Sequence, residues 1–144
     1  MLWVEPEQPA TPGGLDDETL AFAHRMFDLA RDGNTDVLAA HVDAGVPANL
    51  TNDKGDTLLI LAAYHGHGET VAALLARGAD HARVNDRGQT ALAAATFHQS
   101  ADAVTALLDA GADPALGSQS ALATAMFFEL PEMLELLRRE DGPS

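Results

Sequence analysis

Residues 52–63 read NDKGDTLLILAA, and residues 85–96 read NDRGQTALAAAT. The two stretches lie 33 residues apart, and the same shift places residues 51–83 over residues 84–116 with 15 identical positions. Self-similarity at a fixed period of this length is the signature of a chain built from stacked structural repeats. The sequence therefore predicts a solenoid before any single helix is considered.

The repeat continues in weaker form on both sides of these two units. A three-residue deletion near Gly117 restores the register downstream, and Gly45 aligns with Gly78 upstream. Degenerate end units are expected in a solenoid, because their outer faces meet water instead of a neighbouring repeat. We predict one domain over residues 15–141 after a flexible arm at 1–14 that carries Trp3. The domain divides into an N-terminal capping repeat (15–50), two full repeats (51–83 and 84–116) and a C-terminal capping repeat (117–141).

Each unit reads as helix, turn, helix and loop. In the second unit the pattern predicts one helix near residues 57–65 and another near 69–77, with Gly78 suited to a left-handed C-cap. The first unit reads as one longer helix from Asp17 to Arg31. A hydroxyl residue precedes each apolar run and can cap the first turn of a helix. These N-cap candidates are Thr57, Thr90 and Ser120.

The run from Asn52 to Ala63, followed by Gly66-His67 and by Gly78-Ala79-Asp80, resembles the ankyrin repeat, and the next unit repeats this pattern. The resemblance covers roughly residues 17–140. It implies an all-α ankyrin repeat solenoid with short β-hairpin-like fingers, of the short bacterial type. The family's Thr-Pro-Leu-His motif reads TLLI, TALA and SALA in the three units that hold it. Because the Pro and the His are both missing, apolar packing has to replace their contribution, and we expect moderate stability.

The charge of the chain restricts its partners. It holds 22 acidic and 8 basic residues, for a formal net charge of -14. Binding to nucleic acid or to an anionic membrane depends on Lys and Arg, so both partners are disfavoured. The absence of cysteine excludes disulfides and thiolate zinc sites. Because the first ten residues show neither a positively charged nor an apolar region, we expect no secretion signal. We expect a cytoplasmic monomer, and the preference for Arg over Lys favours a bacterial source.

The polar residues do not predict an active site. His65 and His67 have a short, metal-like spacing, and His98 lies one repeat further on. Stacked helices lie roughly 8–10 Å apart, whereas a zinc ion needs its ligands at about 2 Å, so a shared metal site is not expected. No serine lies in a Gly-flanked nucleophile elbow, and no Gly-rich phosphate loop is present. We predict no catalytic residue, no metal and no cofactor, and hence no enzyme.

The resemblance implies binding of another protein on the concave face, which is formed by the finger tips and the exposed part of each first helix. Carried over by motif position, the finger-tip candidates are Asp53, Lys54, Asp56, Asp86, Arg87 and Gln89. The helix candidates precede the turn that ends each first helix, and they are Tyr64, His65, Phe97, His98, Phe127 and Phe128.

Four of the seven aromatic residues occupy these helix positions. Because aromatic side chains offer a large contact area at small entropic cost, we predict a ladder of Tyr64, Phe97 and Phe127, flanked by the neighbouring positions, that anchors an apolar segment of the partner. The alternative is that the rings only pack on one another and close the C-terminal cap. The acidic charge favours a basic segment in the partner, or it merely keeps the solenoid soluble.

The predicted function is that of an adaptor or regulatory subunit that holds a cytosolic protein. An inhibitor or immunity-type protein that covers the active site of an enzyme or toxin is the alternative. A hydrolytic or metal-dependent activity is a third, weaker hypothesis.

Overall fold

The structure is a computed structural model that describes residues 17–138. This part of the chain forms eight helices and no strand beyond an isolated antiparallel bridge between Thr51 and Thr57. The helices are α1 (Asp17–Asp32), α2 (Thr35–Asp43), α3 (Leu58–Tyr64), α4 (Gly68–Ala76), α5 (Ala91–His98), α6 (Ala101–Asp109), α7 (Ala121–Phe127) and α8 (Pro131–Arg138).

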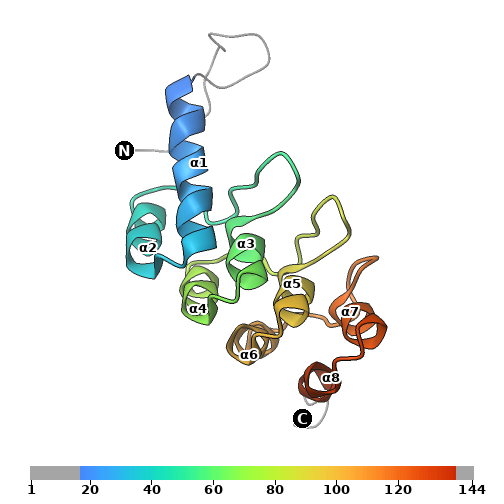
Figure 1. Ribbon diagram of the computed structural model, residues 1–144. Coiled ribbons are helices and arrows are strands. Elements are labelled where there is room, and N and C mark those ends of the chain that lie inside the picture. The colour runs from blue at the N-terminus through green and yellow to red at the C-terminus, as the bar shows by residue number, and fades with distance from the viewer. Residues whose placement is uncertain (1–16, 139–144) are drawn as a thin grey trace.

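The helices stack in two layers (Figure 1). The inner layer holds α1, α3, α5 and α7 in succession, and the outer layer holds α2, α4, α6 and α8. The loops that lead into α3, α5 and α7 extend from the inner layer on one side, and we call their last parts the fingers (residues 51–57, 84–90 and 117–120). Each helix packs on its counterpart in the next unit, so the predicted all-α solenoid is confirmed.

Hydroxyl side chains cap the inner helices, as the sequence predicted. Thr57 and Thr90 each accept a hydrogen bond from the backbone N–H three residues on, at 3.0 and 3.1 Å, and Ser120 does the same at 3.1 Å. Each bond satisfies an N–H group that the first turn of a helix leaves unpaired. The caps therefore fix the point where a finger ends and an inner helix begins.

The turn after α3 requires glycine at position 66. Gly66 has a φ of 76°, and a Cβ atom there would collide with the ring of His98 from the next unit. In the third and fourth units the equivalent left-handed position is held by Gln99 (φ 65°) and Glu129 (φ 54°), and Gly78 (φ 89°) has the left-handed conformation predicted for it. The tight turns therefore bring successive units into close contact.

The inner helices α3 and α5 are buried on nearly every side. Residues 58–63 and 91–96 are all buried. A helix that is apolar all round belongs in the interior, and the alanines of α5 let its neighbours approach closely. These helices form the base from which their last residues reach the surface.

The first unit differs from the prediction. Its long first helix is confirmed as α1, but reading the unit as a single helix was wrong, because α2 follows directly. Gly33 (φ 75°) reverses the chain after α1 as Gly66 does after α3. Leu38 then lies buried in α2, as its repeat counterpart Val71 does in α4. The unit is therefore a helix pair like the others.

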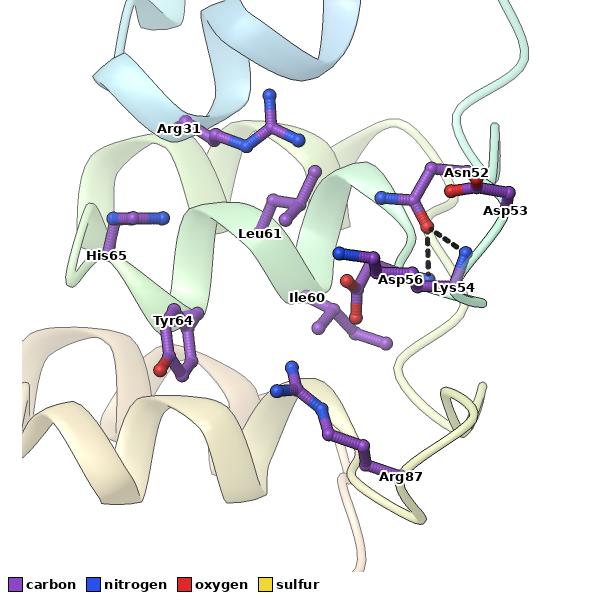
Figure 2. Close-up of a pocket in the computed structure, with 10 residues that line it drawn as sticks. All are labelled: Arg31, Asn52, Asp53, Lys54, Asp56, Ile60, Leu61, Tyr64, His65 and Arg87. Atoms are coloured by element: carbon purple, nitrogen blue, oxygen red, sulfur yellow. Dashed lines mark hydrogen bonds between the residues drawn. The ribbon is translucent and has the colours of Figure 1, made fainter.

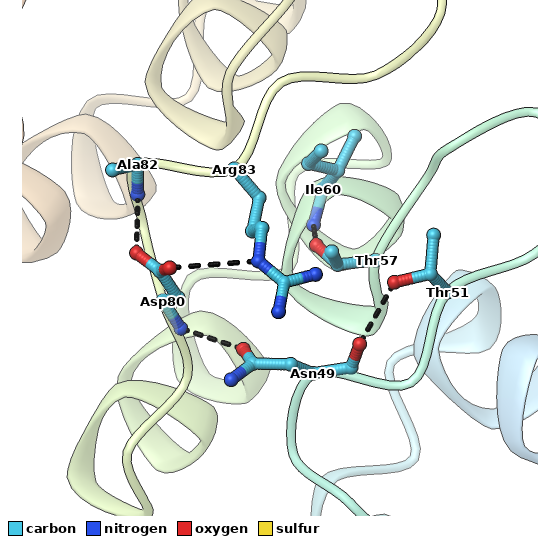
Figure 3. A network of polar contacts seen from close by, with 7 residues as sticks. All are labelled: Asn49, Thr51, Thr57, Ile60, Asp80, Ala82 and Arg83. Carbon is cyan, nitrogen blue, oxygen red and sulfur yellow. Dashed lines mark hydrogen bonds and ion pairs between the residues drawn. The ribbon is translucent and has the colours of Figure 1, made fainter.

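Polar contacts tie together the bases of neighbouring fingers (Figure 3). Asn49 Oδ1 accepts from Asp80 N at 2.7 Å, and Asn49 O accepts from the Thr51 hydroxyl at 2.8 Å. Asp80 in turn accepts from Ala82 N at 2.9 Å and pairs with Arg83 at 3.5 Å. Because Asn49 and Asp80 belong to successive units, these bonds link the two loops directly.

None of the helices within residues 17–138 combines the length and apolar character needed to cross a membrane. The predicted arm at 1–14, with Trp3, lies outside the described residues. The boundaries assigned to the repeats stay predictions.

Candidate functional site

The fingers and the inner helices together form one face of the solenoid, which we call the groove. It contains a pocket of about 280 Å³ between α3, the end of α1 and two successive fingers (Figure 2). Its lining residues are Arg31, Asn52, Asp53, Lys54, Asp56, Ile60, Leu61, Tyr64, His65 and Arg87.

An asparagine organises each of the two complete fingers. Asn52 Oδ1 accepts from the backbone N–H groups of Lys54 and Asp56, both at 2.9 Å. Asn85 Oδ1 makes the two equivalent contacts at 2.9 and 3.0 Å, the first of them with Arg87 N. An Asn side chain can hold a turn in this way because it mimics a backbone acceptor. Lys54 and Arg87 therefore have fixed backbones, while both residues stay exposed.

Asp56 does not lie at a finger tip, contrary to its predicted place. It is 6% exposed, and its Oδ1 accepts from Asn85 Nδ2 at 2.8 Å. The next finger closes over it, since Asp86 N donates to Lys54 O at 3.0 Å. Gln89 is half-buried as well, and its Oε1 accepts from Asn85 Nδ2 at 3.2 Å. Asp56 and Gln89 therefore hold the fingers together and offer little surface to a partner.

The other predicted finger residues are exposed. Asp53 and Lys54 lie at the tip of the first complete finger, and Asp86 and Arg87 lie at the tip of the next one. The pocket brings together three of these four with Tyr64 and His65, which the sequence also selected. His98 is exposed on the neighbouring unit, outside the pocket lining.

The aromatic side chains form a continuous series of ring contacts, which we call the ring ladder. Tyr64 and Phe97 stack with their centroids 5.7 Å apart and an interplanar angle of 5°. Phe97 meets Phe128 edge-on at 5.4 Å, and Phe128 meets Phe127 edge-on at 4.9 Å. Phe97, Phe128 and Phe127 are 41%, 50% and 79% exposed. The ladder therefore presents more apolar surface to solvent toward its C-terminal end.

The order of the rings differs from the sequence columns. The columns placed Phe127 next to Phe97, but the neighbouring ring in the structure is that of Phe128. Helix α5 continues to His98, whereas α7 ends at Phe127 and has Phe128 as its C-cap residue. The ring that neighbours Phe97 therefore lies one position further along the chain than the sequence alignment predicts. His65 contacts the rings of Tyr64 and His67, at 5.4 and 6.4 Å, within its own unit.

A second pocket, of about 430 Å³, lies at the C-terminal end of the ladder. Phe127 and Phe128 form part of its wall, beside uncharged residues of the last finger and of α7. The full lining is Ser118, Gln119, Ala123, Thr124, Phe127 and Phe128. This end of the groove is therefore suited to an apolar group.

Two histidines, His67 at the N-cap of the outer helix α4 and His98 at the end of the inner helix α5, pack against the preceding unit. His67 Nε2 donates to Arg31 O at 2.7 Å, and its ring lies over Gly33 in the same way as the His98 ring lies over Gly66. Within residues 17–138 no three His, Asp or Glu side chains gather as they would around a metal ion.

Protonation of His65 is disfavoured in the folded protein. Partial burial lowers its pKa from the ordinary value of 6.5, and the positive charges of His67, Arg31 and His98 lower it further, against the opposing effect of Asp32. The folded state therefore binds fewer protons than the unfolded state at pH values between the lowered pKa and 6.5. In that window the free energy of unfolding rises with pH.

We expect the substitution His65→Gln to flatten this pH dependence. The check is the urea midpoint of wild type and variant, measured from about pH 5 to about pH 7.5, on both sides of the ordinary histidine value. His24→Gln is the matched control, because His24 is exposed on α1 outside this cluster, and it should keep the wild-type slope. Equal slopes for wild type and His65→Gln would show that His65 is not the source.

Four lining residues escaped the sequence-based selection: Arg31, Asn52, Ile60 and Leu61. Asn52 carried a signal, since it recurs as Asn85 at the 33-residue period. Ile60 stands where the resembled motif has its histidine, and it replaces a polar group with an apolar wall. Arg31 carried a signal as well, since it stands one 33-residue period before Tyr64, and it reaches the pocket from the preceding unit.

The comparisons with known proteins agree with this geometry. A family model described as ankyrin repeats, in three copies, matches residues 26–118, which is more than half of the chain. A protein of Pseudomonas aeruginosa that is named as an ankyrin repeat protein is 55% identical over 56 residues. This match covers 39% of the present chain and 33% of the relative, so the chain spans only about a third of that relative's length.

Proposed function

The chain belongs to the ankyrin repeat family, and from this premise we propose that it is a non-catalytic module that binds another protein across the groove. Ankyrin repeats generally act in protein–protein interaction, and the family is typically non-catalytic. We place the encounter in a bacterial cytoplasm, with the chain as a monomeric adaptor or regulatory subunit.

The observation that supports this proposal most is the exposure of the ring ladder. Phe97, Phe127 and Phe128 lie side by side on the groove, and each is exposed by two fifths or more. A contiguous exposed apolar patch marks an interaction site more often than a folding requirement. Rings also provide interface contact at low entropic cost. A partner segment that covers the ladder would remove this surface from water.

Ring packing alone explains only part of the arrangement. The stacked pair Tyr64–Phe97 stabilises the fold by roughly 0.5–1.5 kcal/mol beyond its buried area, as aromatic pairs do. Phe127 has 79% of its surface exposed and contributes little to such packing. Its position at the rim of the second pocket instead supports contact with a partner.

The double substitution of alanine for Tyr64 and Phe97 is expected to weaken partner binding by about tenfold or more, because large aromatic residues dominate interface energies. Stability should fall by no more than about 2 kcal/mol, the loss of one ring pair in which Tyr64 is partly buried and Phe97 exposed. The measurement is affinity capture from the native lysate, read by mass spectrometry, followed by titration of the captured protein.

Val37→Ala is the matched control, because Val37 is an exposed apolar residue on the outer helix α2. A partner that both variants retain equally would place binding outside the ladder. If the captured protein is an enzyme whose activity falls in the complex, the role is that of an inhibitor instead of an adaptor.

A further inference from the structure

The acidic charge of the protein is absent from the floor of the groove. Helices α3, α5 and α7, which form the floor of the groove, contain no acidic residue. The outer helices hold seven: Asp36, Asp43, Glu69, Asp102, Asp109, Glu132 and Glu135. The acidic residues of the groove itself lie at its edges, in α1 (Asp17, Glu18, Asp28 and Asp32) and in the fingers (Asp53, Asp56 and Asp86). The net charge of -14 therefore does not describe the floor of the groove.

Three basic residues instead converge on the groove pocket. Arg31, Lys54 and Arg87 line it from three successive units, although the whole chain has only 8 basic residues. Figure 2 shows the guanidinium groups of Arg31 and Arg87 on opposite sides of the pocket, with Ile60 and Leu61 between them. Guanidinium and ammonium groups only donate hydrogen bonds, so the pocket gathers donors around a volume of about 280 Å³.

These three cations can form more ion pairs with carboxylates than the neighbouring residues provide. Outside the pocket, Arg77 and Arg83 pair with Asp43 and Asp80. Within residues 17–138, in contrast, neither Lys54 nor Arg87 has a carboxylate within ion-pair distance. Arg31 pairs with Asp28 through Nη1 alone, at 2.9 Å.

Two carboxylates also line the pocket, but neither pairs with Lys54 or Arg87. Asp56 is buried and accepts from Asn85, so it serves the fingers. Asp53 is exposed at the finger tip. Because Arg31 already pairs with Asp28, Lys54 and Arg87 are the lining cations without a carboxylate partner within residues 17–138. They favour an anionic group as occupant, and a carboxylate suits the forked donors of arginine.

The groove changes character toward its other end. From the pocket, which Tyr64 helps to line, the ring ladder leads through Phe97 to Phe128 and to the uncharged second pocket. The two pockets are two units apart, and each unit adds roughly 8–10 Å. An extended chain covers that distance with about five or six residues.

We propose that the occupant of the groove is an extended partner segment that places an Asp or Glu side chain between Arg31, Lys54 and Arg87. About five or six residues away, a large apolar side chain of the same segment packs on Phe128 and Phe127. This proposal rests on the proposed function and specifies the partner's chemistry. It replaces the expectation, drawn from net charge alone, of a basic segment in the groove.

The test is selection from a random peptide library displayed on phage, with peptides fused at their C-termini so that only side chains supply carboxylates. Wild type is expected to enrich peptides with an acidic residue and a large apolar residue at the stated separation. The double variant Arg31→Ala/Arg87→Ala should no longer enrich peptides with an acidic residue. The double variant Phe127→Ala/Phe128→Ala should no longer enrich peptides with a large apolar residue. Arg25→Ala is the matched control, because Arg25 is an exposed arginine of α1 that contacts Phe22 instead of the pocket.

A synthetic copy of the enriched peptide then gives the magnitude by fluorescence anisotropy. Changing its Asp or Glu to Asn or Gln should weaken binding about tenfold, and added salt should weaken the acidic form more than the neutral one. Enrichment of peptides that lack an acidic residue, or that are rich in Lys and Arg, would overturn this inference while groove binding stands. If no peptide is enriched above the background on a surface without the protein, both the inference and the proposed function are overturned.

Discussion

Replacement of Leu74 by alanine is expected to lower the free energy of unfolding by about 2–5 kcal/mol. Leu74 is 1% exposed and lies on α4, which packs against α2, α3 and α6. Its loss would open a cavity between three units. Because each unit of a solenoid is stabilised by its neighbours, the whole array should unfold at a lower urea concentration, and the urea midpoint is the measurement.

The matched control is Leu20→Ala, which makes the same chemical change at an exposed position of α1. Surface substitutions usually change stability by less than about 0.5 kcal/mol. A loss below about 1 kcal/mol for Leu74→Ala would show that the units do not stack on α4 as described, since even tolerant core sites cost more than that.

The fold was predictable because each of its signals is local and recurs. A hydroxyl cap such as Thr57 and the apolar run after it lie within one unit. Because the same signals recur every 33 residues, they support the prediction of a repeat fold more strongly than a single occurrence would. The one error in the predicted fold was that helix α2 was not predicted, and its cause is local as well. Its sequence is less apolar than that of α4, with Leu38 as the one buried residue among its positions.

The site was less predictable, because it depends on contacts between units. Asp56 resembles an exposed turn residue in the sequence, and only the approach of Asn85, 29 residues later, buries it. Lys54 and Arg87 lie one 33-residue period apart and were both predicted, but Arg31 stands at another repeat position and joins them only where the units stack. The ladder was predicted as a set of rings, but which of Phe127 and Phe128 neighbours Phe97 depends on side-chain packing between units.

Asn85→Ala is expected to cost about 2–4 kcal/mol, more than any other substitution in the fingers. Asn85 is 5% exposed and accepts from two backbone N–H groups, while its Nδ2 donates to the buried carboxylate of Asp56. Removing it leaves that carboxylate buried without this donor, which is costlier than the loss of a neutral hydrogen bond. The free energy of unfolding in urea is the measurement.

Asn52→Ala provides the matched control within the same chain. Asn52 makes the same two backbone contacts in the preceding finger, and it is only half-buried. Its loss should cost about 1–2 kcal/mol, and the difference between the variants reports on the bonds that Asn85 Nδ2 makes to Asp56 and Gln89. Adding Asp56→Ala to Asn85→Ala should recover part of the loss, since the unpaired charge is gone. Two outcomes would contradict this prediction: equal losses of stability for the two asparagine variants, or no recovery in the double variant. Either would mean that the contact between the two fingers does not stabilise the groove.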